Sequence, residues 1–212
     1  MSTAKVYIIE DQSCFDERAI AEISKHLPAS RLEKAARYRR PIDRKNCILV
    51  YYLLMYGLKK NFGITQVPEI SAGEYGKPYF PGSGIHFSMS HSDIGVCCGI
   101  ADCNIGADIQ DTDIKYDEIA SLVMSEKEQE IIFASPFPQT EFARFWTLKE
   151  SLLKFRGTGI NDDLKNIDFS ASSGEVFTYG GLKFHSRTNS SFCVSACTGT
   201  ISPEFVRIDG LC

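Results

Sequence analysis

The sequence lacks the short patterns that identify several common enzyme and membrane classes. No window approaches the ~18 apolar residues of a membrane span, and the opening MSTAKVYIIEDQS has no basic region followed by a long apolar run. We therefore expect neither a membrane span nor a signal peptide. A GxSxG nucleophile motif, a Walker-type GxxxxGK[ST] and a GxGxxG after a strand are also absent. Ordinary nucleotide-binding folds and hydrolases with a nucleophile elbow are thus not indicated.

An excess of positive charge and a regular cysteine framework are missing too. The 212 residues include 23 Lys and Arg against 27 Asp and Glu, a net charge of -4, which argues against a nucleic-acid partner. The eight cysteines form no CxxC pair, so we interpret them as buried free thiols of a cytoplasmic protein and expect no zinc. This length supports one large domain or two small lobes.

An internal repeat appears when the sequence is shifted by 97 residues. Three pairs of segments then align: FSMSHSDIGVCCGIAD from Phe87 with FHSRTNSSFCVSACTG from Phe184, ILVYYLLMYGLKKNFG from Ile48 with FWTLKESLLKFRGTGI from Phe145, and LPASRLEKAARY from Leu27 with MSEKEQEIIFAS from Met124. They indicate strand-turn-strand, a long helix and a capped helix start. We predict an α+β fold of two pseudo-symmetric lobes, 1–101 and 102–212, each a long helix packed on a small, mainly antiparallel sheet.

The ionisable side chains of one half have no counterparts in the other at this offset, which favours one site at the lobe junction. In GADIQ, Asp108 and Gln110 alternate with an apolar residue, so their oxygens share one face of a predicted strand. This pair is either the solvent side of an edge strand or a cation ligand set. In FWTLKESLLKFRGTG, Glu150 and Lys154 share a face of an apolar helix. On spacing alone a surface ion pair is favoured, but a carboxylate in so apolar a helix needs a partner or a metal.

Two further groups could bind anions. Ser88, Ser90 and Ser92 surround His91 in FSMSHS; small hydroxyls with an imidazole suit a phosphate, and a polar cluster at a turn is the alternative. ASRLEKAARYRRPIDRK is a basic segment that could bind ligand phosphates or form a solvated helix face. Hard oxygen ligands beside basic groups predict Mg²⁺-assisted transfer of a phosphorylated group.

The segments GKPYF, FSMSHS, GADIQ and FWTLKESLLKFRGTG, in this order, resemble the 4'-phosphopantetheinyl transferases. The resemblance is to the larger, single-chain pseudodimeric type that activates surfactin synthetase, and it covers about residues 25 to 165. It implies transfer of the phosphopantetheine arm of coenzyme A to a serine of an acyl- or peptidyl-carrier protein in fatty acid, polyketide or nonribosomal peptide synthesis. The by-product would be adenosine 3',5'-bisphosphate. A monomer is expected, because the second lobe fills the place of a partner subunit.

The resemblance also implies roles for individual residues. Asp108 and Glu150 would be ligands of Mg²⁺, or of Mn²⁺ as an alternative, with Gln110 at the position of a third ligand where an acidic residue is common. Glu150 would also be the general base, and Lys154 would hold the pyrophosphate. The coenzyme A contacts implied are Arg31 and Lys34 at the 3'-phosphate, Lys77 and Pro78 on the adenine side, and Ser90, His91 and Lys154 at the phosphates. Ser88, Asn46 and Cys47 depart from the residues common in the family, which are Asn, Arg and a hydroxyl residue.

Two other functions remain open from the sequence. The chain could be a non-catalytic module that binds coenzyme A or a carrier protein, with the metal site weakened at Gln110. A phosphohydrolase acting on small phosphoesters is less well supported, because the sequence offers no second metal cluster.

Overall fold

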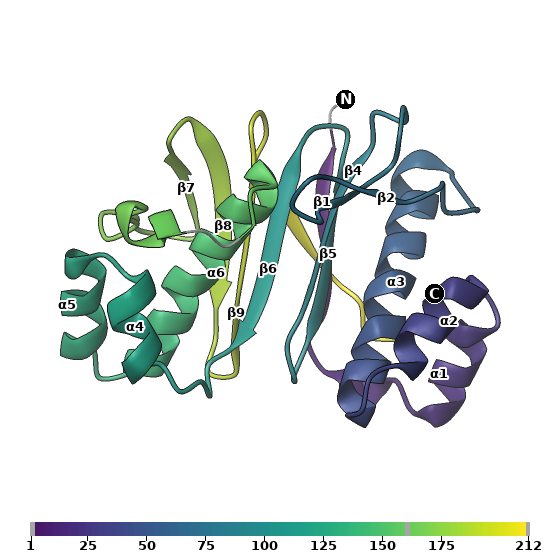
Figure 1. Ribbon diagram of the computed structural model, residues 1–212, viewed down its shortest axis with the longest axis horizontal. Coiled ribbons are helices and arrows are strands. Elements are labelled where there is room, and N and C mark those ends of the chain that lie inside the picture. Colours follow the sequence, from purple (N-terminus) through teal and green to yellow (C-terminus); the bar gives the residue numbers. More distant parts are fainter. Residues whose placement is uncertain (1–2, 160–161, 211–212) are drawn as a thin grey trace.

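The computed structural model describes residues 3–159 and 162–210, and it shows an α+β protein in which two β-sheets lie between helices at the two ends (Figure 1). The helices are α1 (Glu17–Ser24), α2 (Ala29–Ala36), α3 (Pro41–Phe62), α4 (Asp117–Val123), α5 (Glu126–Ala134) and α6 (Pro138–Arg156), with short 3₁₀ segments η1 (Gln12–Cys14) and η2 (Asp162–Asn166). The strands are β1 (Ala4–Ile9), β2 (Ser71–Ala72), β3 (Pro78–Tyr79), β4 (His86–His91), β5 (Val96–Ala101), β6 (Ile105–Asp111), β7 (Val176–Tyr179), β8 (Leu182–Thr188), β9 (Phe192–Thr198) and β10 (Glu204–Arg207).

Each main sheet carries one long helix on its outer face. The first sheet has the order β10-β1-β5-β4, and α3 packs on it through a core that includes Leu49, Leu53 and Tyr7. The second sheet has the order β6-β9-β8-β7, and α6 packs on it through a core that includes Leu148 and Phe184. All neighbouring strands are antiparallel except β1 and β10. The predicted fold class is confirmed.

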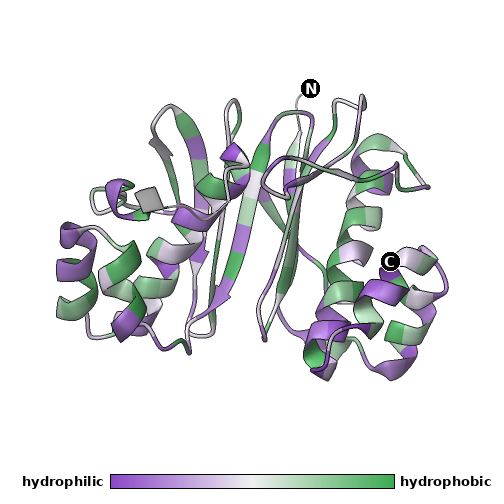
Figure 2. Ribbon diagram, in the orientation of Figure 1, coloured by the Kyte–Doolittle hydropathy of each residue, from purple (hydrophilic) through white to green (hydrophobic). Residues whose placement is uncertain are grey.

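The inner faces of the two sheets pack against each other, so the sheets are buried on both sides. Along β1, Tyr7 and Ile9 join the core under α3, whereas Val6 and Ile8 join a separate core shared with β6 and β9. This alternation is the period of two that a strand imposes. Figure 2 shows hydrophobic and hydrophilic residues mixed on the outer helices of both ends, as expected of amphipathic helices with one face on a core.

The described cysteines are mostly buried, as the sequence predicts. Seven of the eight cysteines lie in the described ranges as free thiols, most of them buried, and Cys212 lies outside those ranges. Within residues 3–159 and 162–210, no helix combines the length and the apolar character that crossing a membrane requires.

The 97-residue repeat corresponds to equivalent elements of the two halves. Adding 97 to the bounds of β4, β5 and α2 gives 183–188, 193–198 and 126–133, which match β8, β9 and α5 to within a residue at each end. The helix α3 begins at Pro41 and α6 at Pro138, again 97 residues apart. Two strands of the main sheets break the correspondence. β10 returns from the end of the chain to pair with β1, and β7 pairs with β8, whereas β4 is the edge of the first sheet. The boundary between residues 101 and 102 stays a prediction.

The helix α6 packs closely against β6 at Gly106. A Cβ atom at this position would lie 1.9 Å from the Ser151 carbonyl oxygen and 2.5 Å from the Phe155 backbone nitrogen, both in α6. We therefore expect Gly106→Ala to lower the free energy of unfolding by roughly 1–3 kcal/mol or more, because α6 cannot withdraw without disturbing the core. Urea unfolding measures this, with Gly199→Ala as the control, since its Cβ would meet nothing closer than 4.0 Å. Equal stability of the two variants would contradict the expectation.

Candidate active site

Three predicted site residues meet between β4, β6 and α6. The Oδ1 atom of Asp108 accepts a hydrogen bond from Ser90 Oγ at 2.6 Å and pairs with Lys154 Nζ at 2.6 Å. The Lys154 ammonium also donates to Ser90 Oγ at 2.9 Å. Because Asp108 is only 5% exposed, these charges interact more strongly than they would in water. Segments that are 64 residues apart in the chain thus form one polar cluster.

Glu150 lies one helical turn before Lys154 and is half-buried. Its Oε1 atom is buried, and no donor among the described residues reaches it. Burial, and then the charge of Asp108, raise the pKa of Glu150 to about 7, although Lys154 acts in the opposite direction. Burial would lower the pKa of Lys154, but Asp108 outweighs that effect and raises it. The cluster therefore holds two carboxyl groups and one permanent ammonium, with one acceptor left unused.

This donor set fits a hard cation. A buried carboxylate oxygen without a partner is the kind of ligand that Mg²⁺ binds, and Asp108 is close enough to affect its pKa. Gln110 follows Asp108 by two residues on β6, on the same face of the strand. Among the side chains of residues 3–159 and 164–210, no group of three or more His, Cys, Asp and Glu suits a metal. A cation here would thus take further ligands from Gln110, from water and from the phosphates of a substrate.

A pocket of about 250 Å³ opens beside the cluster. Glu150, Lys154 and Gly157 line it from α6 and its end, and Lys77 and Pro78 line it from the opposite side. The helix α6 ends at Gly157, whose φ of 72° is left-handed and whose amide donates to the Leu153 carbonyl. Gly157 is therefore a C-cap of the kind that glycine favours, because the left-handed conformation costs it no steric strain.

The predicted basic residues of α2 lie at a different hollow. Arg31 and Lys34 line a depression of about 450 Å³ with Tyr51, and the Arg31 guanidinium lies 5.1 Å from the centre of the Tyr51 ring. His91 is at the exposed end of β4. Partial desolvation lowers the pKa of His91, and the charges of both Lys154 and Arg31 lower it further. The His91 imidazole therefore lies within the electrostatic influence of one residue from each hollow, Lys154 and Arg31.

Two departures from the family pattern have clear structural roles. The Ser88 hydroxyl accepts a hydrogen bond from the Ala107 amide at 3.0 Å and donates to the Ala107 carbonyl at 3.3 Å, so it connects the edges of the two sheets. The fully buried Asn46 donates to the Ser92 carbonyl at 2.8 Å. Asn46 thus fixes the turn that immediately follows His91.

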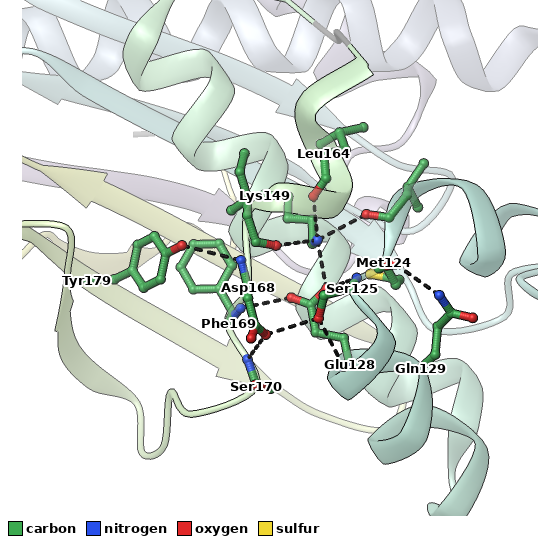
Figure 3. Close-up of polar contacts among 12 residues, drawn as sticks. Met124, Ser125, Glu128, Gln129, Lys149, Leu164, Asp168, Phe169, Ser170 and Tyr179 are labelled. Carbon is green, nitrogen blue, oxygen red and sulfur yellow. Dashed lines mark hydrogen bonds and ion pairs between the residues drawn. The ribbon is translucent and has the colours of Figure 1, made fainter.

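Sequence reasoning gave no role to Lys149, which the structure buries completely. Its ammonium pairs with Glu128 at 2.7 Å and donates to backbone carbonyls (Figure 3). Glu128 also completes a capping box with Ser125 at the start of α5. The predicted helix start at this position was correct, and the Ser-x-x-Glu spacing was the only signal that pointed towards the network.

Comparison with known proteins agrees with these motifs. Residues 104–201, which include Asp108, Glu150 and Lys154, match the sequence profile of the 4'-phosphopantetheinyl transferase superfamily. The chain is 31% identical over 151 residues to a 4'-phosphopantetheinyl transferase of Bacillus subtilis, a match that covers 69% of this chain and 65% of the relative. It is 28% identical over 185 residues to the L-aminoadipate-semialdehyde dehydrogenase-phosphopantetheinyl transferase of Saccharomyces cerevisiae, covering 80% and 68%. It is 27% identical over 169 residues to the 4'-phosphopantetheinyl transferase psf-1 of Bacillus pumilus, covering 76% and 72%. The chain thus spans slightly less than two thirds of the first of these relatives.

Proposed function

This chain belongs to the 4'-phosphopantetheinyl transferase superfamily, and we propose that it transfers the 4'-phosphopantetheine arm of coenzyme A to a serine of an acyl- or peptidyl-carrier protein. The observation that carries this proposal is the cluster of Asp108, Ser90 and Lys154 beside Glu150, whose Oε1 atom has no donor among the described residues. We further propose that the reaction depends on Mg²⁺ and releases adenosine 3',5'-bisphosphate. The internal repeat supports action as a monomer.

In the proposed reaction, the serine oxygen of the carrier protein bonds to the phosphorus that bears the pantetheine arm. The bond from this phosphorus to the bridging oxygen of the pyrophosphate breaks, and adenosine 3',5'-bisphosphate leaves with the electron pair. The serine proton passes to the Glu150 carboxylate, which acts as the general base directly or through a water molecule. Asp108, Glu150 and Gln110 would hold the Mg²⁺ ion, which when bound would neutralise charge on the phosphate oxygens.

Lys154 has to change partners in this scheme. Its ammonium is paired with Asp108 in the ligand-free protein, and a pyrophosphate in the 250 Å³ pocket would offer it a second anion. Its raised pKa keeps it charged throughout, so it can stabilise the negative charge that develops as the phosphoanhydride breaks. Ser90 and His91 are the last two residues of β4 and would bind phosphate oxygens. Arg31 and Lys34 would bind the 3'-phosphate in their own hollow.

The test is to incubate the protein with coenzyme A, Mg²⁺ and apo-carrier proteins from fatty acid, polyketide and nonribosomal peptide synthesis. Intact-mass measurement is expected to show the addition of one phosphopantetheine arm to at least one carrier. Glu150→Ala is expected to abolish the addition, and the exposed Lys60→Ala is expected to leave it unchanged. If no carrier is modified, and calorimetry shows coenzyme A binding that Mg²⁺ does not affect, the chain is a binding module instead.

A further inference from the structure

The ammonium of Lys77 is committed to oxygen atoms of the protein. It donates to Asn104 Oδ1 at 2.7 Å, to the Phe155 carbonyl at 3.2 Å and to the Ile105 carbonyl at 3.3 Å. The Asn104 amide in turn donates to the Phe155 carbonyl at 2.6 Å. Lys77 belongs to the loop before β3, whereas its acceptors lie at the start of β6 and at the end of α6. One side chain therefore joins three separate segments.

The aliphatic part of the Lys77 side chain also packs against the end of α6, at Gly157. Its Cδ and Cβ atoms would lie 3.3 and 3.8 Å from a Cβ atom placed on Gly157, so the absence of a side chain there lets the loop rest on the end of α6. The loop is itself closed by the Gly73 amide, which donates to the Lys77 carbonyl at 2.9 Å. Lys154 is the residue immediately before Phe155, whose carbonyl accepts a hydrogen bond from Lys77. Movement of this helix end would therefore move Lys154.

The Lys77 ammonium is bound by neutral oxygen atoms and not by a counter-charge. Among residues 3–159 and 164–210, whose side chains the structure describes, no carboxylate lies within ion-pair distance of the Lys77 ammonium. Burial lowers the pKa of Lys77 to about 8, with a small opposing effect from Cys197 on β9. The other ionisable groups near Lys77 include His86 on β4, whose pKa is lowered first by burial and then by the charge of Lys77. Tyr75, Glu150 and Lys154 line the same pocket as Lys77. Burying an unneutralised ammonium is unfavourable, so its retention calls for a role.

We propose that Lys77 is a positioning residue that clasps the 73–79 loop to the end of α6 and so fixes the wall of the pocket opposite Glu150 and Lys154. The resemblance implied that Lys77 contacts the adenine side of coenzyme A. Its ammonium instead binds Asn104, Ile105 and Phe155, so any ligand contact from this residue would come from its stem or backbone. The catalytic consequence rests on the proposed function, but the clasp itself does not.

The structural part of the inference is tested without ligand by hydrogen exchange of the protein. In Lys77→Met, amides at the end of α6 and the start of β6 are expected to exchange faster by on the order of tenfold, because local opening becomes easier. Asn104→Ala is a second variant that removes one acceptor and the Asn104–Phe155 bond, and it is expected to loosen the same amides. The exposed Lys60→Met is the matched control. Unchanged exchange in both Lys77→Met and Asn104→Ala would overturn the clasp.

The catalytic part is tested by the pH dependence of phosphopantetheine transfer. A neutral amine has two hydrogens for three acceptors, so kcat is expected to fall as the pH rises through about 8. Lys154 does not produce this limb, since its pKa is raised. Arginine stays protonated, so Lys77→Arg is expected to extend activity to higher pH, whereas Lys77→Met is expected to lower kcat at every pH.

A rise in KM for coenzyme A in Lys77→Met, with kcat and hydrogen exchange unchanged, would show a ligand contact and overturn the positioning role. If the wild-type protein modifies no carrier, the proposed function fails, while the exchange experiment still decides the clasp.

Discussion

Replacing Lys149 with methionine is expected to lower the free energy of unfolding by roughly 3–5 kcal/mol, the largest effect on stability that we expect from a single substitution here. The Lys149 side chain is fully buried, and its ammonium pairs with Glu128 at 2.7 Å. It also donates to the carbonyls of Ile167, Leu164 and Val123 at 2.6, 2.8 and 3.0 Å (Figure 3). These contacts connect the middle of α6 to the end of α4, to α5 and to the segment after η2.

The large loss of unfolding free energy is expected because the Glu128 carboxylate stays buried without its partner. Glu128 is also fully buried, and its carboxylate accepts hydrogen bonds from the Ser125 and Phe169 amides. Without Lys149 this carboxylate keeps its backbone donors but loses its counter-charge, and an unpaired buried charge is far less favourable than a buried pair. Adding Glu128→Gln to Lys149→Met removes the uncompensated charge and is expected to restore part of the stability.

Urea unfolding at neutral pH measures both variants, and the coupling between them follows from a double-mutant cycle. The exposed Lys60→Met serves as the control and is expected to stay within about 0.5 kcal/mol of the wild-type protein. A loss below about 1 kcal/mol in Lys149→Met would mean that the pair is readily hydrated, and the network would then not anchor α6.

The parts of this protein that could be predicted from sequence are those with a local signal. The repeat located the long helices and the strand-turn-strand pairs, because each has its own apolar period and turn residues. Asp108, Glu150 and Lys154 were predicted as a site, and the structure brings Asp108 and Lys154 into contact with Ser90. Their spacing along a strand and a helix limits where the side chains can point, which is why the contact could be anticipated, whereas the roles assigned to these residues stay predictions.

The parts that could not be predicted depend on packing between distant segments. Nothing in EFVR, the sequence of β10, indicates that it pairs in parallel with β1, because parallel pairing has no turn to specify it. Lys149 and Glu150 are neighbours with similar polarity, yet one is fully buried in an ion pair and the other faces the pocket. Likewise, the Gly-Lys-Pro motif placed Lys77 near a ligand, but only the close approach of Gly157 directs its ammonium into the protein.

Replacing Glu150 with glutamine is expected to remove transfer activity and, at the same time, to stabilise the metal-free protein at higher pH. Burial and Asp108 raise the pKa of Glu150 from 4.5 to about 7. Between these two pH values the folded protein binds a proton that the unfolded chain has released. The contribution of Glu150 to the free energy of unfolding therefore falls as the pH rises from about 4.5 to 7, and it stays low above pH 7. Glutamine carries no charge at any of these pH values, so the variant escapes this loss.

Thermal unfolding in EDTA at pH 5 and pH 8 measures the effect on stability. The melting temperature of Glu150→Gln relative to wild type is expected to be higher at pH 8 than at pH 5, whereas the exposed Glu118→Gln shows no such change. A difference that does not vary with pH would contradict the raised pKa. Transfer to a carrier protein is expected to fall by a factor on the order of 10²–10⁴, as on loss of a general base.

Together these results separate the two interpretations of the Glu150 and Lys154 pair. If the pair served stability alone, the variant would lose stability at pH 8, because Lys154 would lose a favourable partner. A variant that gains stability while losing activity identifies Glu150 as a carboxylate kept in an unfavourable environment for its reaction.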